Sequence, residues 1–200
     1  MSDAPGIRLI VVGVSAGGLT ALRTLVAALP AGFGIPLAVV QHRSRDSELL
    51  CELLQECAPL QVSEVNDKQP ILPGYVYVGP PDYHLLVEPG SFALSTDEPV
   101  RFSRPSIDVM FRSAADACGP DLVGVVLTGA NADGARGLRS IVDRGGYAVV
   151  QDPATAEVAV MPQYALQAVP EACVLPLDRI GPHLAAIRGR RMPPCKAASA

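Results

Sequence analysis

Short apolar runs recur along the chain and alternate with longer segments of helical periodicity. The runs predict strands over residues 7–12, 35–41, 122–128, 147–151 and 173–176, and the segments between them predict helices over residues 19–29, 47–57, 105–118, 134–144 and 161–168. Strands that are apolar throughout suit a sheet covered on both faces. We therefore expect an α/β fold with a mostly parallel, three-layer, doubly wound sheet.

The middle of the chain has a different pattern. Residues 75–78, 84–87 and 91–94 are short strand-like stretches separated by Gly and Pro, which predicts an antiparallel hairpin at one edge of the sheet. No internal repeat or linker interrupts the pattern. We expect one domain over residues 1–187 and a disordered tail over residues 188–200, which is basic and then rich in small residues.

Composition narrows the classes of function. The 200 residues carry a net charge of −4, which argues against nucleic acid as the main partner. No apolar stretch is long enough to insert in a membrane, and the first residues have no pattern of a secretory signal, so we expect a cytoplasmic protein. The five cysteines are an odd number without C-x-x-C spacing. This favours free thiols over a disulfide framework or a zinc site.

The loop from Gly13 to Gly18 has the sequence G-V-S-A-G-G and lies between a predicted strand and a predicted helix. G-x-S-x-G in this position is typical of a nucleophile elbow, in which glycines permit a sharp turn that exposes the Ser15 hydroxyl. It could also be a phosphate-binding loop or an ordinary strand–helix turn. The full G-x-G-x-x-G pattern is missing, and the second strand ends in Gln41-His42 rather than an acidic residue.

Two further residues complete a candidate catalytic triad. His42 ends the second strand as Ser15 ends the first, and parallel strands place such ends at one edge of a sheet. A histidine there can activate the serine as a general base. Asp133 follows the buried run at residues 122–128 and could orient the imidazole, although Asp-Gly is also typical of a turn or helix cap. Asp82, Asp108 and Asp152 are rival carboxylates, and His183 is a rival base.

Five stretches of the chain, taken together, resemble the catalytic domain of the CheB-type protein-glutamate methylesterases. They are residues 12–18, 40–42, 104–111, 127–134, and 151–153 with Met161-Pro162. The resemblance implies a triad of Ser15, His42 and Asp133 that hydrolyses γ-methyl esters of glutamate on the cytoplasmic region of chemoreceptors and releases methanol. Some members of the family also deamidate glutamine. Neither a cofactor nor a metal is implied.

The chain also departs from the family pattern. Many members carry an N-terminal receiver domain, whereas the elbow here begins at Gly13, so we expect this switch to be absent and activity to be constitutive or controlled by a separate regulatory protein. Members often have Met-Pro after the histidine and Met at position 130, where this chain has Arg43-Ser44 and Ala130. Arg43 and Arg45 could attract an acidic receptor helix or form an ordinary solvated surface.

These departures concern the substrate, so three other functions stay open. One is a related serine hydrolase that acts on another ester or amide. The second is a nucleotide-binding module built on the loop at residues 13–18, and the third is a binding protein without activity.

Overall fold

A parallel sheet forms the centre of the computed structural model, which describes residues 6–42, 49–189 and 191–195. The strands run in the order β3-β4-β2-β1-β7-β8-β9, and every neighbouring pair is parallel. They are β1 (Leu9–Val14), β2 (Leu37–Gln41), β3 (Gln61–Glu64), β4 (Tyr75–Val78), β7 (Leu122–Val126), β8 (Tyr147–Gln151) and β9 (Cys173–Leu175). The predicted α/β class is confirmed.

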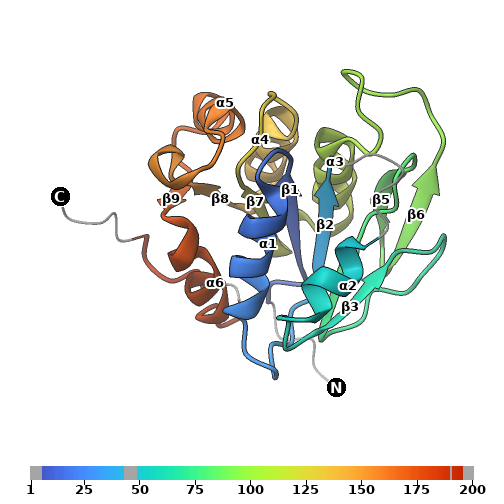
Figure 1. Cartoon of the computed structure of the whole chain (residues 1–200), viewed down its shortest axis with the longest axis horizontal. Helices are drawn as coiled ribbons and strands as arrows, with labels where there is room; N and C mark the ends of the chain where they lie inside the picture. Colours follow the sequence, from blue (N-terminus) through green and yellow to red (C-terminus); the bar gives the residue numbers. More distant parts are fainter. Residues whose placement is uncertain (1–5, 43–48, 190, 196–200) are drawn as a thin grey trace.

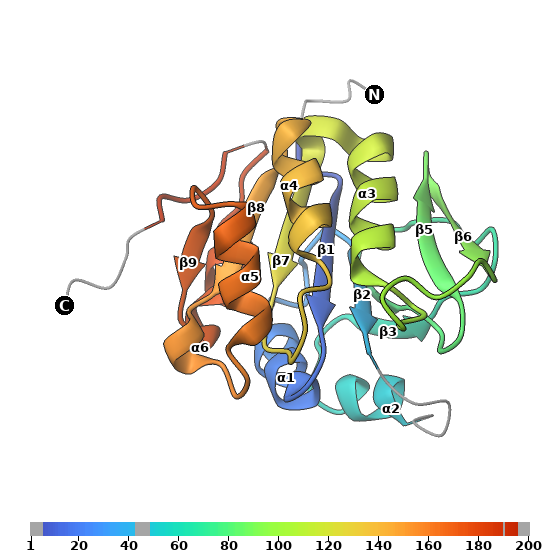
Figure 2. The same cartoon turned by 90° about the horizontal axis from the view of Figure 1, so that it is seen from above.

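Helices cover both faces of this sheet (Figures 1 and 2). One face carries α1 (Gly18–Ala27), α2 (Leu50–Gln55) and α6 (Leu177–Ala185), and the other carries α3 (Ile107–Cys118), α4 (Ala135–Asp143) and α5 (Val160–Ala168). Two short 3₁₀ helices, η1 (Gly119–Asp121) and η2 (Pro153–Thr155), lie in the connections between elements. Among the described residues, no helix is both long and apolar enough to cross a membrane.

Each layer of helices has its own apolar core against the sheet. In β1, Ile10 and Val12 face the α1 side, whereas Leu9 and Val11 face the α3 side, and all four are buried. This alternation follows from the two-residue repeat of a strand. A strand whose two faces are both buried is therefore apolar at every position, as the sequence pattern predicted.

The hairpin is smaller than predicted. β5 (His84–Glu88) and β6 (Ser91–Ser95) pair in an antiparallel sheet of their own, which packs beside α3 (Figure 2). The prediction that residues 75–78 belong to this hairpin is wrong, because β4 pairs in parallel with β2 and β3 inside the main sheet. β3 was missed because its sequence, QVSE, is polar and partly exposed at the edge of the sheet. Which strands pair with each other depends on contacts between residues far apart in the chain. A local sequence pattern does not encode these contacts.

The prediction about the cysteines is wrong for Cys173 and Cys195. Cys173, the first residue of β9, forms a disulfide with Cys195. Cys51, Cys57 and Cys118 are not part of a disulfide among the described residues. The bonded residues are 22 positions apart, and their meeting depends on a return of the chain past the edge strand, which spacing does not reveal. The bond attaches the segment at 191–195 to the sheet, and the limit of the domain at residue 187 stays a prediction.

Candidate active site

The site lies where the three central strands end. β1 pairs with β2 on one side and with β7 on the other, and Val14 is in register with Gln41. The backbone continues this pairing beyond the strands, because the N–H of Ser15 donates to Thr128 O at 3.0 Å and the N–H of His42 donates to Val14 O at 3.1 Å. Ser15, His42 and the loop after β7 therefore meet at one edge of the sheet, as predicted.

The turn that presents Ser15 requires two glycines for different reasons. Gly17 has φ of 75°, a left-handed conformation that glycine adopts without strain. Gly129, on the loop after β7, lies directly against the serine. A Cβ at Gly129 would be 2.0 Å from Met161 Sδ and 2.9 Å from Ser15 Cβ. Close contact between these loops thus depends on the absence of a side chain at position 129.

Asp133 is the carboxylate that the structure brings to His42. The distance from His42 Nε2 to Asp133 Oδ2 is 2.9 Å. The carboxylate is buried, with 2% of the residue exposed, and it accepts four further hydrogen bonds. The donors are the Ser106 hydroxyl and the backbone N–H groups of Ile107, Asp108 and Gly134. Because Ile107 and Asp108 begin α3, Asp133 also caps that helix.

These donors decide the charge of Asp133. Burial acts to raise its pKa, but the hydrogen bonds from His42 and from the N–H groups of Asp108 and Ile107 outweigh burial and hold the pKa below its usual value. Asp133 is therefore a carboxylate at neutral pH. A buried anion beside the imidazole can stabilise the imidazolium that forms when the base takes up a proton.

Asp108, one of the rival carboxylates, has a different role. Its Oδ1 accepts the N–H groups of Gly134 and Gly137 at 3.0 and 2.7 Å, so it caps α4 as Asp133 caps α3. Burial raises the pKa of Asp108, and the nearby charge of Asp133 raises it further against the hydrogen bond from Gly137. Asp133 therefore caps the helix that contains Asp108, and Asp108 caps the helix that follows Asp133.

Asp152 and Asp82, the two remaining rival carboxylates, have partners other than His42. The carboxylate of Asp152 accepts the N–H of Ala154 and caps η2. Asp82 faces Arg104 at 3.6 Å. Both side chains are therefore accounted for by local structure and not by the imidazole.

His183, the rival base, lies near the end of α6. Its Nε2 is 4.0 Å from Cys173 Sγ, and its ring stacks on Tyr147. Cys173 and Tyr147 begin their strands, so His183 lies at the amino edge of the sheet, opposite Ser15. This position separates it from the serine of the elbow.

Three residues in the network were not singled out in the sequence. Asn131 contacts both His42 and Asp133. Ser106 joins Asp133 to His84, because the N–H of Ser106 donates to His84 Nδ1 at 3.1 Å. The available signal was position: Ser106 precedes a helix as a cap residue does, and Asn131 lies two residues before Asp133. Arg43 and Arg45, also predicted to flank the site, lie outside the described residues.

Ser15 itself is not yet engaged. In the part of the chain that the structure describes, the Ser15 hydroxyl makes no hydrogen bond to His42, whose Nδ1 faces Asn131 instead. Catalytic hydrogen bonds are often long or unformed before substrate binds. The geometry thus brings together a histidine–carboxylate pair and a serine at the turn beside it.

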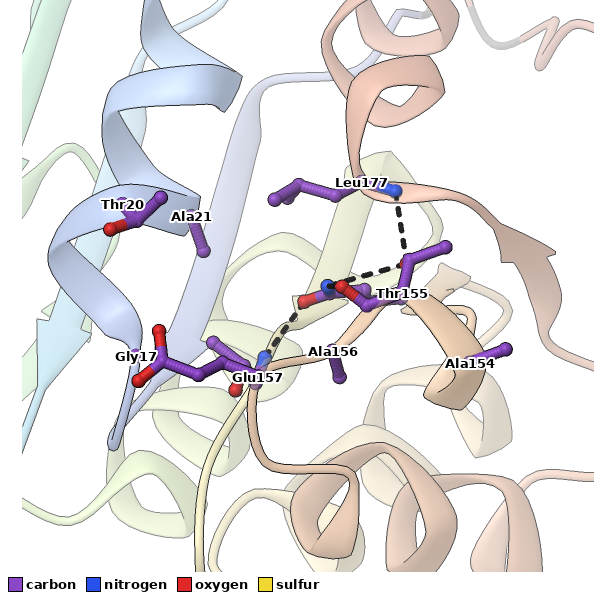
Figure 3. Close-up of a pocket in the computed structure, with 10 residues that line it drawn as sticks. Gly17, Thr20, Ala21, Ala154, Thr155, Ala156, Glu157 and Leu177 are labelled. Atoms are coloured by element: carbon purple, nitrogen blue, oxygen red, sulfur yellow. Dashed lines mark hydrogen bonds between the residues drawn. The ribbon is translucent and has the colours of Figure 1, made fainter.

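A hollow of about 240 Å³ adjoins the elbow on the α1 side (Figure 3). Its walls include Thr20, Thr155 and Leu177, and the Glu157 side chain reaches across Gly17. α1 has no acidic residue in its first turn and no side-chain cap. The Glu157 carboxylate therefore supplies negative charge at the amino end of this helix. Its contact with Gly17 is a second reason why position 17 carries no side chain.

Comparisons with known proteins assign the chain to a family. A family model described as CheB methylesterase matches residues 10–184. A relative from Leptospira interrogans is 48% identical over 173 residues, which are 86% of this chain and 90% of that protein. A protein-glutamate methylesterase/protein-glutamine glutaminase of Carboxydothermus hydrogenoformans is 38% identical over 90% of this chain, which spans 55% of that relative.

A solved structure has the same architecture. The crystal structure of the Thermotoga maritima CheB methylesterase catalytic domain superposes with a TM-score of 0.85 and 30% sequence identity, over 89% of this chain and 97% of that one. The family model covers the strands, the elbow and the loop that carries Asp133. The chain belongs to the CheB methylesterase family.

Proposed function

We propose that this protein hydrolyses γ-methyl esters of glutamate side chains on a protein substrate, with Ser15 as nucleophile, His42 as general base and Asp133 as the orienting carboxylate. The single observation that carries the proposal is the 2.9 Å contact between His42 and the buried Asp133 beside the serine of the elbow. The names of relatives, which describe a glutamate methylesterase and a glutamine glutaminase, supply the substrate class.

The chemistry is acyl transfer in two steps. His42 removes the hydroxyl proton of Ser15 as the oxygen attacks the ester carbonyl, and then protonates the departing methoxide to form methanol. Water, activated by the same imidazole, cleaves the acyl-enzyme and releases the glutamate carboxylate. A glutamine side chain follows the same path with ammonia as leaving group, which accounts for the two activities in the relatives' names.

The tetrahedral intermediate needs donors for its negative oxygen. Within the described residues, the backbone N–H groups of Ala16 and Ala130 donate to no other group. Ala16 follows the nucleophile, and Ala130 follows Gly129, whose position packs against Ser15 Cβ. Both N–H groups are therefore suitable oxyanion donors, and neither depends on the side chain that replaces the family's usual methionine at position 130.

The surface beside the site suits a polypeptide substrate. A hollow of about 520 Å³ is lined by Arg101, Ala132, Arg136 and Tyr164, and it adjoins the loop of Asp133. Phe102 next to it is fully exposed. Two arginines beside exposed aromatic side chains form a surface that favours binding of a polypeptide rich in acidic residues. The cytoplasmic region of a methyl-accepting chemoreceptor has this chemistry, so the reaction would take place in the cytoplasm.

The test is release of labelled methanol from a methylated receptor fragment, compared with Ser15→Ala. We expect release by the native protein and a loss of roughly 10⁴-fold or more in the variant, which keeps its fold because only one hydroxyl is removed. A small methyl ester is assayed in parallel. Activity on the small ester alone would move the proposal to another ester substrate, and activity retained by Ser15→Ala would rule out Ser15 as nucleophile.

A further inference from the structure

Asn131 closes a ring of three hydrogen bonds with the two polar partners of the site. The backbone N–H of Asp133 donates to Asn131 Oδ1 at 3.0 Å. Asn131 Nδ2 lies 3.2 Å from His42 Nδ1. His42 Nε2 lies 2.9 Å from Asp133 Oδ2, which completes the ring.

The proton positions in this ring follow from the chemistry of its members. Asp133 is ionised, so it can only accept, and His42 Nε2 must carry the hydrogen between them. The backbone N–H of Asp133 can only donate, which places the amide oxygen of Asn131 towards it and the NH₂ group towards His42. An NH₂ group donates and does not accept, so His42 Nδ1 holds a lone pair. Every donor in the ring thus meets an acceptor.

We propose that Asn131 is a positioning residue that holds neutral His42 with its proton on Nε2 and its lone pair on Nδ1, the nitrogen that takes the proton of Ser15. The proposal rests on the proposed hydrolase function, since it assigns how the base of that site is prepared. The amide and the serine hydroxyl use the same lone pair, so the amide must yield when the serine attacks. This explains why Ser15 and His42 make no hydrogen bond among the described residues.

The ring also predicts a pH dependence. A protonated imidazole carries a hydrogen on Nδ1, which would face the NH₂ hydrogens of Asn131. This contact is less favourable for the cation than for the neutral ring, so we expect Asn131 to influence how hydrolysis depends on pH. Aspartate at position 131 would reverse the effect, because a carboxylate accepts from the Nδ1–H of the cation.

The other charged groups around His42 are the same residues in every variant. Asp133 is in contact with the ring, and Asp108 lies behind it at Gly134. Arg101 donates to Ala132 O on the neighbouring loop, and Glu157 lies across Gly17 on the far side of the elbow. Substitution of Asn131 leaves these charges in place and removes only the hydrogen bond from the backbone N–H of Asp133, so a shift that grows from Asn131→Ala to Asn131→Asp reports the contact at Nδ1.

The first experiment measures kcat/KM against pH on a small methyl ester for the native protein, Asn131→Ala and Asn131→Asp. We expect the acidic limb to move to higher pH in Asn131→Ala and to move further in Asn131→Asp. Asn66→Ala, at an exposed turn, is the matched control and should superpose on the native profile. Three superposed acidic limbs would refute the role of Asn131, whatever the change in rate.

The second experiment does not depend on activity. Long-range ¹H–¹⁵N spectra of histidine-labelled protein report the tautomer of His42, which is assigned by comparison with His42→Gln. We expect the Nε2–H form in the native protein and a mixture of tautomers in Asn131→Ala. An Nδ1–H form in the native protein would overturn the proposal. If this spectrum is as expected and no ester is hydrolysed, the proposed function fails while the role of Asn131 in setting the tautomer stands.

Discussion

The two ends of the central sheet each hold a histidine in a sheltered position, and the two histidines have different surroundings. At the carboxyl end, His42 lies between the carboxylate of Asp133 and the amide of Asn131. At the amino end, His183 is 8% exposed and lies near Cys173 Sγ and the ring of Tyr147. Burial lowers the pKa of His183, and no carboxylate near it opposes this among the described residues.

The comparison of the two histidines shows that burial alone does not make an imidazole suitable as a catalytic base. A buried imidazole with apolar neighbours is neutral, but nothing selects which nitrogen holds the lone pair or stabilises a cation if one forms. His42 gains both properties, a defined position of the lone pair and a stabilised cation, from its hydrogen-bond partners.

The largest expected effect comes from exchanging the two histidines for glutamine in turn. His42→Gln should lower ester hydrolysis by roughly 10⁴- to 10⁶-fold, because the base is lost. His183→Gln should retain full hydrolysis, since it lies at the opposite end of the sheet. The test is to measure methanol release by both variants. Circular dichroism checks that each variant keeps its fold. Loss of activity in His183→Gln with the fold intact would contradict the division between the two ends.

A methyl group at the contact between the loops should have the next largest effect. Gly129→Ala places Cβ against Met161 Sδ and Ser15 Cβ, so the elbow must shift. A displacement of about 1 Å at a nucleophile costs roughly 10²-fold in rate, and overpacking costs about 1–3 kcal/mol of stability. The matched control is Gly32→Ala, where a Cβ meets nothing within 4 Å. Activity of Gly129→Ala equal to that of the control would show that the loops adapt.

The disulfide should matter for stability and not for catalysis. Cys195→Ser opens the loop that the disulfide closes between residues 22 positions apart. The unfolded chain then gains conformational entropy, which should lower the free energy of unfolding by about 3 kcal/mol. In a chain of this size, that loss lowers Tm by roughly 6–12 °C. Thermal unfolding with and without reductant measures it, and Cys118→Ser, which removes a free thiol, is the control. A reductant that abolished hydrolysis at a temperature where the protein stays folded would link the two ends of the sheet.

The smallest effect concerns the pH dependence of stability at the amino end. Because burial holds the pKa of His183 below its ordinary value of 6.5, the unfolded chain takes up a proton there before the folded chain does. Stability from this group is complete above pH 6.5 and is lost as pH falls through the folded value. His183→Gln should therefore lose less stability than the native protein between about pH 7 and 5, by about 2 °C in Tm or less. An equal loss in both proteins would show that His183 takes up a proton as readily in the folded chain as in the unfolded chain.

Much of the site was predictable because it depends on where strands end. Ser15 and His42 each follow an apolar run, and parallel strands bring such positions together. The choice of Asp133 over Asp108 was not predictable in this way, since both lie near helix starts. The structure separates them through their hydrogen bonds, because Asp133 meets His42 and Asp108 meets the backbone of α4.

The class of fold, the approximate bounds of most elements and the candidates Ser15 and His42 could be assigned from the sequence alone, because apolar periodicity and short motifs are local properties. The three-dimensional structure was needed to show that β4 belongs to the main sheet, that Cys173 is bonded to Cys195 and that Asn131 faces His42. Each of these is a contact between residues far apart in the chain. Such contacts depend on how whole elements pack, and the local pattern of polar and apolar residues does not encode that arrangement.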